Sequence, residues 1–301
     1  MKVQLRTGHS GKGLSYYGRK RACLRRAQLD ELVEQERIAA GIPEYKGGGS
    51  SASLLGTMMH GILEAYTRSG GCDPGALVFE PADHAAVSYM LIDKITKEPV
   101  IEVARKLFAW WQIEYPPDIL GTRIGAELGL PQTVEGAARI KERFGHEVTG
   151  DMDLVTRLDQ TQADRLCLMF GGDFHPGLWG WDYKVLADIS SAADYANSGQ
   201  QHVLYPELFR LETGKRLDRF GYVIIARGRK RIPEPEMKIM VMEPNQATQI
   251  EGLIRRIDNT ERVSNLLTDQ NPALTDFNLD ACTNRYGDKC PHWASGRCKR
   301  V

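Results

Sequence analysis

The chain has 301 residues, 42% of them hydrophobic, with 39 Lys plus Arg balanced by 39 Asp plus Glu. This length allows one large domain with a sizeable core, and the charge balance excludes an overall basic field, so any binding of nucleic acid must come from local patches. The sequence starts without an apolar signal core, and no run reaches the roughly 18 apolar residues needed to span a membrane. We therefore expect a cytoplasmic protein.

The first part of the chain has the patterns of two helices. Residues 14–40 are rich in Arg, Leu, Gln and Glu and predict a helix that carries Cys23. Ser53 is the expected N-cap of a second helix, over residues 54–67. At its edge lies His60, where either a structural or a functional histidine would fit. The apolar residues of this helix have the spacing of one buried stripe and are Leu55, Met58, Met59, Ile62, Leu63 and Tyr66.

The middle of the chain changes from helical to strand character. Residues 83–111 again have a helical pattern, with a break at Pro99, and predict a helical insert over about residues 70–118. Turn residues then separate expected strands at 123–128, 147–158, 165–170 and 180–186. A helix over 188–213, a hairpin of strands at 220–227 and 238–242, and a helix over 246–267 follow. These elements predict a single α/β domain with a central mixed sheet flanked by helices.

Asp182 and Lys184 lie two residues apart in the expected strand at 180–186, so their side chains share one face. A carboxylate and an ammonium side by side, with a backbone carbonyl between them, can bind a divalent metal and steady an attacking water. The alternative is a surface ion pair worth under about 1 kcal/mol. Trp179 and Trp181 favour burial instead, where an unpaired charge is costly.

Further candidate residues lie on the neighbouring expected elements. Asp153 ends a Gly-x-x-Asp motif that begins at Gly150, and Asp151 shares its strand face, so either acid could bind a metal. Gln201 and Tyr205 lie one helical turn apart on the helix after the Asp-x-Lys strand. Gln200 is an alternative to Gln201, and Tyr205 could be only a core aromatic residue.

In chain order, a helix histidine, Gly-x-x-Asp, Asp-x-Lys and Gln-x-x-x-Tyr resemble the RecB-like branch of the PD-(D/E)XK nuclease superfamily. The resemblance covers about residues 54–211 and implies a restriction-endonuclease-like core. It also implies that an acid on an earlier strand takes part, for which Glu127 is the candidate. The implied metal ligands for Mg²⁺ or Mn²⁺ are His60, Asp153 and Asp182, with Lys184 acting on the attacking water and Gln201 and Tyr205 completing the helix motif.

The resemblance implies one nuclease domain, with a core over residues 54–245 that holds the helical insert at about 70–118. An N-terminal helical segment, residues 1–45, precedes the core, and a C-terminal helix with a cysteine tail, residues 246–301, follows it. The implied activity is that of a metal-dependent DNA exonuclease in recombination or repair, acting on single strands or DNA ends. The alternatives are a protein of this fold that binds DNA or a partner without cutting, and a sequence-specific endonuclease.

Six cysteines are too few for a disulfide scaffold, and in a reducing compartment a cluster of them indicates a metal. AddB-type and CRISPR-adaptation nucleases hold a [4Fe-4S] cluster with one cysteine before the core and three after it. This chain is similar, and the implied ligands, which would clamp its terminus, are Cys23, Cys282, Cys290 and Cys298. The wide spacing in the tail departs from the usual Cys-x-x-Cys, so Zn²⁺, with His292 as a replacement ligand, and free cysteines are alternatives.

The remaining cysteines, Cys72 and Cys167, are expected to be structural, with Cys167 packed as a small hydrophobe in the strand at 165–170. Basic residues gather at 19–21, 25–26, 227–231 and 297–300. They could line a channel for a phosphate backbone, or they could be solvated surface charges.

Overall fold

A computed structural model describes residues 2–4, 29, 51–69, 78–80, 92–93, 96–193, 196, 200–228, 234–243 and 247–267. The strands are β1 (Lys2–Gln4), β2 (Val78–Glu80), β3 (Thr122–Leu130), β4 (Gly150–Leu158), β5 (Gly177–Leu186), β6 (Arg219–Ala226) and β7 (Glu236–Met242). The helices are α3 (Ser51–Ser69), α4 (Val100–Glu114), α5 (Val134–Phe144), α6 (Gln160–Phe170), the short 3-10 helix η3 (Ile189–Ser191), α8 (Gln201–Thr213) and α9 (Ala247–Leu267). None of the described helices is long and apolar enough to cross a bilayer.

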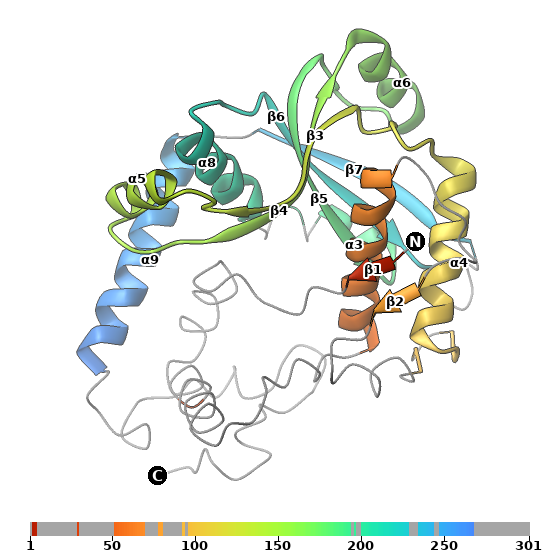
Figure 1. Cartoon of the computed structure of the whole chain (residues 1–301), viewed down its shortest axis with the longest axis horizontal. Helices are drawn as coiled ribbons and strands as arrows, with labels where there is room; N and C mark the ends of the chain where they lie inside the picture. Colours follow the sequence, from red (N-terminus) through yellow and green to blue (C-terminus); the bar gives the residue numbers. More distant parts are fainter. Residues whose placement is uncertain are drawn as a thin grey trace.

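The main sheet has five strands in the order β3-β4-β5-β6-β7, which is their order along the chain (Figure 1). Neighbouring strands are antiparallel except β5 and β6, which are parallel and are joined by a connection that contains α8. A parallel pair needs such a crossover, whereas antiparallel neighbours can be joined directly. The hairpin expected at 220–227 and 238–242 is confirmed as β6 and β7. A separate parallel pair consists of β1 and β2.

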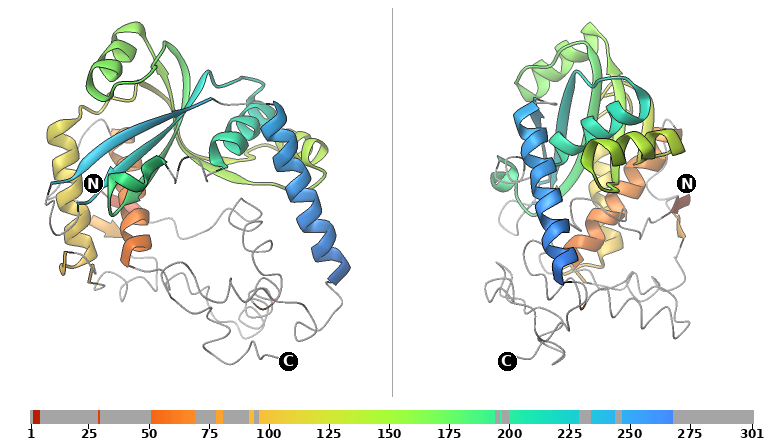
Figure 2. Two further views of the ribbon diagram at one scale, coloured as in Figure 1. Left: turned by 180° about the vertical axis from the view of Figure 1, so that it is seen from behind. Right: turned by 90° about the vertical axis from the view of Figure 1, so that its left-hand side faces the viewer.

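Helices cover both faces of the main sheet, as Figures 1 and 2 show. One hydrophobic cluster joins α3 and α4 to the first face, and a second cluster joins α5, α8 and α9 to the other face. The predicted α/β fold, a central mixed sheet flanked by helices, is therefore confirmed. The stripe expected on α3 is also confirmed, because each of these side chains is at most 4% exposed: Leu55, Met58, Met59, Ile62, Leu63 and Tyr66.

The strand expected at residues 165–170 is wrong, because this segment is the second half of α6. Leu166 is fully buried and Leu168 is 88% exposed, whereas a strand would place both on one face. A capping box starts the helix: Asp159 accepts a hydrogen bond from the backbone N–H of Gln162 at 2.8 Å, and the Gln162 side chain accepts one from that of Asp159 at 3.0 Å. Cys167 therefore lies on a helix, not in a strand.

Other boundaries also differ from the expectations. The sequence pattern does not reveal α5, which buries only a few residues, and a Thr133 cap marks its start, with an oxygen 2.9 Å from the Gly136 nitrogen. In the expected helical insert, α4 begins only after Pro99, and β2 is a strand. Within the expected helix at 188–213, the described residues include η3 and, from residue 201, α8. The helix expected at 14–40 lies outside the described residues, apart from position 29.

Stacked tryptophans anchor β5 to the sheet. The rings of Trp179 and Trp181 are fully buried, with centroids 4.9 Å apart and planes 13° from parallel. The Trp181 indole N–H donates a hydrogen bond to the Thr156 hydroxyl at 2.8 Å, so its polar group is satisfied inside the core. On β6, Gly221 leaves room for the Trp181 ring, which a Cβ atom at that position would overlap. These contacts fix the strand that carries Asp182 and Lys184.

Arg227 does not belong to a solvent-exposed basic patch, as the sequence suggested. Its guanidinium forms an ion pair with Asp93, and the two side chains are 7% and 0% exposed. The backbone N–H and the hydroxyl of Thr96 also donate hydrogen bonds to the Asp93 carboxylate, at 2.8 and 3.1 Å. This buried pair ties the segment before α4 to the end of β6. The other basic clusters, at residues 19–21, 25–26 and 297–300, lie outside the described residues.

Replacing Asp93 by Ala should lower the free energy of unfolding by about 3–5 kcal/mol, because it leaves the Arg227 charge buried without its partner. Urea unfolding at neutral pH measures this change. The double variant Asp93→Leu with Arg227→Met removes both charges and should recover most of the loss. A single variant as stable as the wild type would show that the pair does not hold the two segments together.

Candidate active site

Two carboxylates are buried on neighbouring strands of the sheet. Asp153 on β4 is 6% exposed and Asp182 on β5 is 1% exposed. The antiparallel register that pairs Leu154 with Trp181 places the two acids next to each other. The backbone N–H of Tyr183 donates a hydrogen bond to Asp153 Oδ2 at 2.6 Å. The sheet itself therefore brings together two acids that lie far apart in the sequence.

Asp182 and Lys184 form a buried ion pair through Asp182 Oδ2 and Lys184 Nζ, with side chains 2% and 13% exposed. The alternative of a surface ion pair is thereby excluded. Burial raises the pKa of Asp182 to about 6, because the attraction of the Lys184 charge is outweighed by burial together with the nearby negative charge of Asp153. Besides its ionic contact, Asp182 Oδ2 accepts no hydrogen bond within the described part of the chain.

His60, on the helix α3, contacts the Asp153 carboxylate. Its Nδ1 lies 3.1 Å from Asp153 Oδ1, and its side chain is 27% exposed. Burial alone would lower the pKa of His60, but the charge and hydrogen bond of Asp153 outweigh it and raise the pKa. In the same way, burial would raise the pKa of Asp153, but the His60 charge and hydrogen bond, with the Lys184 charge, lower it. The pair therefore favours a protonated imidazole beside an ionised carboxylate.

Gln201 and Tyr205 on α8 hold the second oxygen of the Asp182 carboxylate, Oδ1, in place. The Gln201 side-chain nitrogen donates to Asp182 Oδ1 and to the Tyr205 hydroxyl, both at 3.1 Å. The alternative residue, Gln200, faces the guanidinium of Arg256 on α9 instead. Tyr205 is 9% exposed, and burial raises the pKa of its hydroxyl, which keeps it protonated at neutral pH.

Gly150, the first residue of the Gly-x-x-Asp motif, makes room for this helix. A Cβ atom at position 150 would lie 2.7 Å from a carbon of the Tyr205 ring, too close for any other residue without a shift of the ring. The glycine thus has a packing role on β4, and the carboxylate of Asp153 three residues later has the polar contacts. Asp153, not Asp151, bonds to His60 and to the backbone of Tyr183.

The structure brings together all six catalytic candidates that the sequence singles out: His60, Asp153, Asp182, Lys184, Gln201 and Tyr205. Their roles stay predictions. Glu127 lies on β3, but its side chain is outside the described part. The expected cluster ligands lie outside the described residues too, as do Cys72 and His292: Cys23, Cys282, Cys290 and Cys298.

The donor types of this site suit a hard divalent cation, since two carboxylates and an imidazole converge on it. However, in the described ranges no group of three or more His, Cys, Asp or Glu side chains is arranged to hold a metal ion. Asp153 is engaged by His60, and Asp182 by Lys184. A metal would therefore have to compete with these cations, because Lys184 Nζ contacts Asp182 Oδ2 and the Gln201 side chain donates a hydrogen bond to Oδ1.

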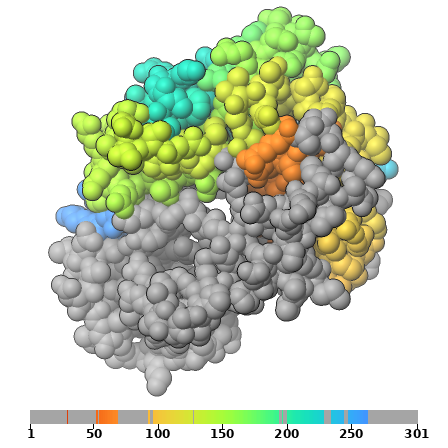
Figure 3. All heavy atoms as spheres, viewed as in Figure 1, coloured from red at the N-terminus to blue at the C-terminus, as the bar shows by residue number. Residues whose placement is uncertain are grey.

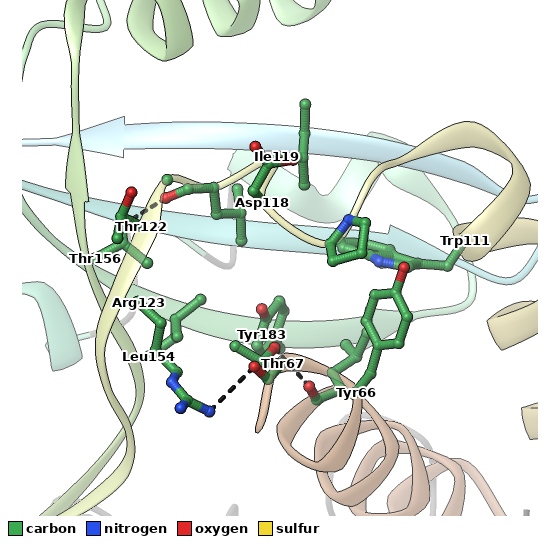
Figure 4. Close-up of a pocket in the computed structure, with 14 residues that line it drawn as sticks. Tyr66, Thr67, Trp111, Asp118, Ile119, Thr122, Arg123, Leu154, Thr156 and Tyr183 are labelled. Carbon is green, nitrogen blue, oxygen red and sulfur yellow. Dashed lines mark hydrogen bonds between the residues drawn. The ribbon is translucent and has the colours of Figure 1, made fainter. Parts of the chain in front are cut away.

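A pocket of 260 Å³ lies on the α3 and α4 side of the sheet (Figure 4). None of the six candidates lines it, but its wall includes Leu154 and Tyr183, the residues that directly follow Asp153 and Asp182. Sequence patterns do not reveal this pocket, because the residues around it come from α3, α4, the segment between α4 and β3, and three strands. The pocket is adjacent to the candidate site, and Leu154 and Tyr183 lie between the two.

Comparison with protein families and with characterised proteins finds no match. A solved structure from Eubacterium rectale, named "Putative exonuclease", is similar to this chain with a TM-score of 0.49 and 15% sequence identity. The similarity covers 85% of this chain and 82% of that chain. A likeness at this level carries no information about activity.

Without metal, the free energy of unfolding should fall as the pH rises from about 6 to 8, because the raised pKa of His60 means that the folded state binds more protons than the unfolded state. The stabilisation by protonated His60 is complete below 6.5, the ordinary pKa of histidine, and is lost as the pH rises through the raised pKa of His60 in the folded protein. Urea unfolding in EDTA at several pH values measures the slope.

The variant His60→Gln should flatten this fall, and His146→Gln, which changes a histidine paired with Asp258 away from the site, should keep it. A slope that is the same in wild type and His60→Gln would contradict the charged His60–Asp153 pair.

Proposed function

We propose that the chain hydrolyses phosphodiester bonds of DNA, as a Mg²⁺- or Mn²⁺-dependent exonuclease that acts on single strands or DNA ends. The observation that carries the proposal is the buried pair of carboxylates, Asp153 and Asp182, with Lys184 in contact. Burying two neighbouring acids raises the free energy of the folded protein unless the charges are compensated, so such a pair favours a chemical role over a structural one.

Each residue of the cluster has a role that its contacts support. His60, Asp153 and Asp182 would hold the divalent ion, which when bound polarises the phosphate and acidifies water. Lys184 Nζ would supply positive charge next to the phosphate and donate a hydrogen bond to the attacking water, and this charge would favour loss of a proton from that water to solvent. The side-chain amide of Gln201 keeps the Asp182 carboxylate in place, and the Tyr205 hydroxyl holds that amide.

Two other functions use the same fold. A protein that binds DNA or a partner without cutting would need no buried acid pair, so the geometry of Asp153 and Asp182 argues against it. A sequence-specific endonuclease would use the same six residues, and products of digestion distinguish it: an exonuclease releases short products from an end, and an endonuclease cuts a circular strand.

The variants Lys184→Ala and Asp182→Ala should each lower Mn²⁺-dependent cleavage of labelled single-stranded DNA at least about a hundredfold, because each removes one part of a joint arrangement. Both proteins should stay folded, which circular dichroism checks.

Asp151→Asn is the matched control, because it changes a neighbouring acid of β4, whereas His60 bonds to Asp153. Cleavage near the wild-type rate by either alanine variant would reject the assignment, and so would an equal loss in Asp151→Asn.

We also propose that Cys23, Cys282, Cys290 and Cys298 hold one metal centre, a [4Fe-4S] cluster. The one-plus-three order of these cysteines supports it, and Zn²⁺ would be the other metal for the same ligands. Ligands near both ends of the sequence close a loop of almost the entire chain, which constrains the unfolded state strongly. Loss of one ligand should therefore destabilise the whole protein.

Anaerobically purified protein should be brown and contain iron and sulfide, and Cys23→Ser should lose both together with stability. Cys167→Ser is the control, since this cysteine lies on α6 with its sulfur 3.6 Å from the Phe174 carbonyl oxygen. Iron that survives Cys23→Ser rejects this set of four ligands. Stoichiometric zinc without iron would reject the iron-sulfur cluster but would still agree with one metal centre held by the four cysteines.

A further inference from the structure

The pocket behind the candidate site runs from the protein surface into the core. Its rim includes the exposed residues Asp118, Thr122 and Arg123, and its inner wall includes the buried residues Trp111 and Leu154. Figure 3 shows α3, in orange, at the surface beside yellow parts of the chain. The pocket is therefore open to a ligand from solvent, while most of its interior is protein core.

Aromatic side chains give the pocket its shape. Tyr66, Trp111 and Tyr183 line it, and each is at most 4% exposed (Figure 4). Ligand pockets for drug-sized molecules have volumes of about 300–1,000 Å³, so a pocket of 260 Å³ suits something smaller. A single base of a nucleic acid is smaller than a drug-sized molecule and has a flat aromatic ring, and bases stack on aromatic side chains with about 1–3 kcal/mol each.

The pocket and the candidate active site share Tyr183 as a wall. Its ring contacts the His60 ring edge-to-face, with centroids 6.3 Å apart, and its backbone N–H donates to Asp153. On the pocket side the same ring contacts Trp111, with centroids 6.2 Å apart. A base in the pocket would thus be separated from His60 by one aromatic ring.

The two ends of the pocket carry opposite charges. Arg123 donates to the backbone carbonyl oxygen of Thr67, at the end of α3, with a distance of 3.1 Å (Figure 4). A guanidinium has five N–H donors, so this contact holds Arg123 in place and leaves donors for a phosphate. Asp118, whose side chain is 60% exposed, lies on another part of the rim, 4.0 Å from Arg165. Its carboxylate can accept a hydrogen bond from the amino group of a base.

We propose that this pocket receives one base of the substrate strand, with Arg123 binding the phosphate of that nucleotide and Asp118 accepting a hydrogen bond from an amino group on the base. The inference rests on the proposed nuclease function, because that function supplies the ligand. It adds a preference that the catalytic cluster does not contain: cytosine should bind better than thymine, since thymine has no exocyclic amino group.

The test is calorimetric titration of the full chain, in EDTA, with deoxycytidine 5′-monophosphate and thymidine 5′-monophosphate. The wild type should bind the cytidine nucleotide more tightly. Arg123→Gln should weaken both about tenfold, through loss of a charge-assisted hydrogen bond. Asp118→Ala should remove the preference between them. Arg262→Gln, which removes an exposed guanidinium on α9 on the other side of the sheet, is the control and should bind like the wild type.

No binding by the wild type, or equal affinities of Arg123→Gln and Arg262→Gln, would overturn the proposal. An unchanged preference in Asp118→Ala would overturn the role of Asp118. Cleavage of single-stranded DNA with Mn²⁺ by the same preparations separates this proposal from the nuclease function. Cleavage with nucleotide binding unaffected by these variants rejects the pocket alone, and nucleotide binding that depends on Arg123 without any cleavage rejects the nuclease function alone.

Discussion

The burial of Asp153 and Asp182 side by side is the constraint to which the surrounding structure responds. An ionised carboxylate in a protein interior is stable only when cations and hydrogen-bond donors surround it. Here the compensation is incomplete, because burial keeps the pKa of Asp182 raised to about 6 in spite of Lys184. A divalent cation would remove the remaining cost. The proposed activity therefore rests on a buried carboxylate whose loss of hydration is only partly offset by its neighbours.

Several distant segments contribute to this arrangement. The α3 helix presents His60 because its apolar stripe is fixed against the sheet, and α8 presents Gln201 because Gly150 lets the Tyr205 ring approach β4. Stacking of Trp179 on Trp181 fixes the strand that carries Asp182. Since the catalytic candidates lie on regular helices and strands with packed neighbours, their positions are set by the core and not by loops.

Much of the fold is visible in the sequence, and the errors have local physical causes. The α3 stripe and the strands around Asp153 and Asp182 are predicted because their apolar spacing is regular. The strand predicted at 165–170 is wrong because a short apolar run fits either a strand or a buried helix. The capping box at Asp159 favours the helix. The α5 helix is missed since it buries few residues. Arg227 looks like part of a surface patch because its partner, Asp93, lies more than a hundred residues away, and only the folded chain brings them together.

The residues of the candidate site can be predicted from the sequence for a different reason. Asp-x-Lys and Gln-x-x-x-Tyr are short patterns whose spacing already places their side chains on one face of a strand or helix. Which acid of β4 and which glutamine of α8 faces the cluster is decided by packing, and the structure places Asp153 and Gln201 there. The pocket leaves no pattern in the sequence, because its walls are distant residues that meet only in the folded protein.

In the proposed function, the buried carboxylates serve to bind a divalent cation. The most direct test is the urea unfolding midpoint of wild type and Asp182→Asn at neutral pH, with and without Mn²⁺. A cation that binds only the folded site raises the midpoint of the wild type. We expect this rise in the wild type, no rise in Asp182→Asn, and a metal-free variant at least as stable as the metal-free wild type. An equal rise in both proteins, or no rise in the wild type, would contradict it.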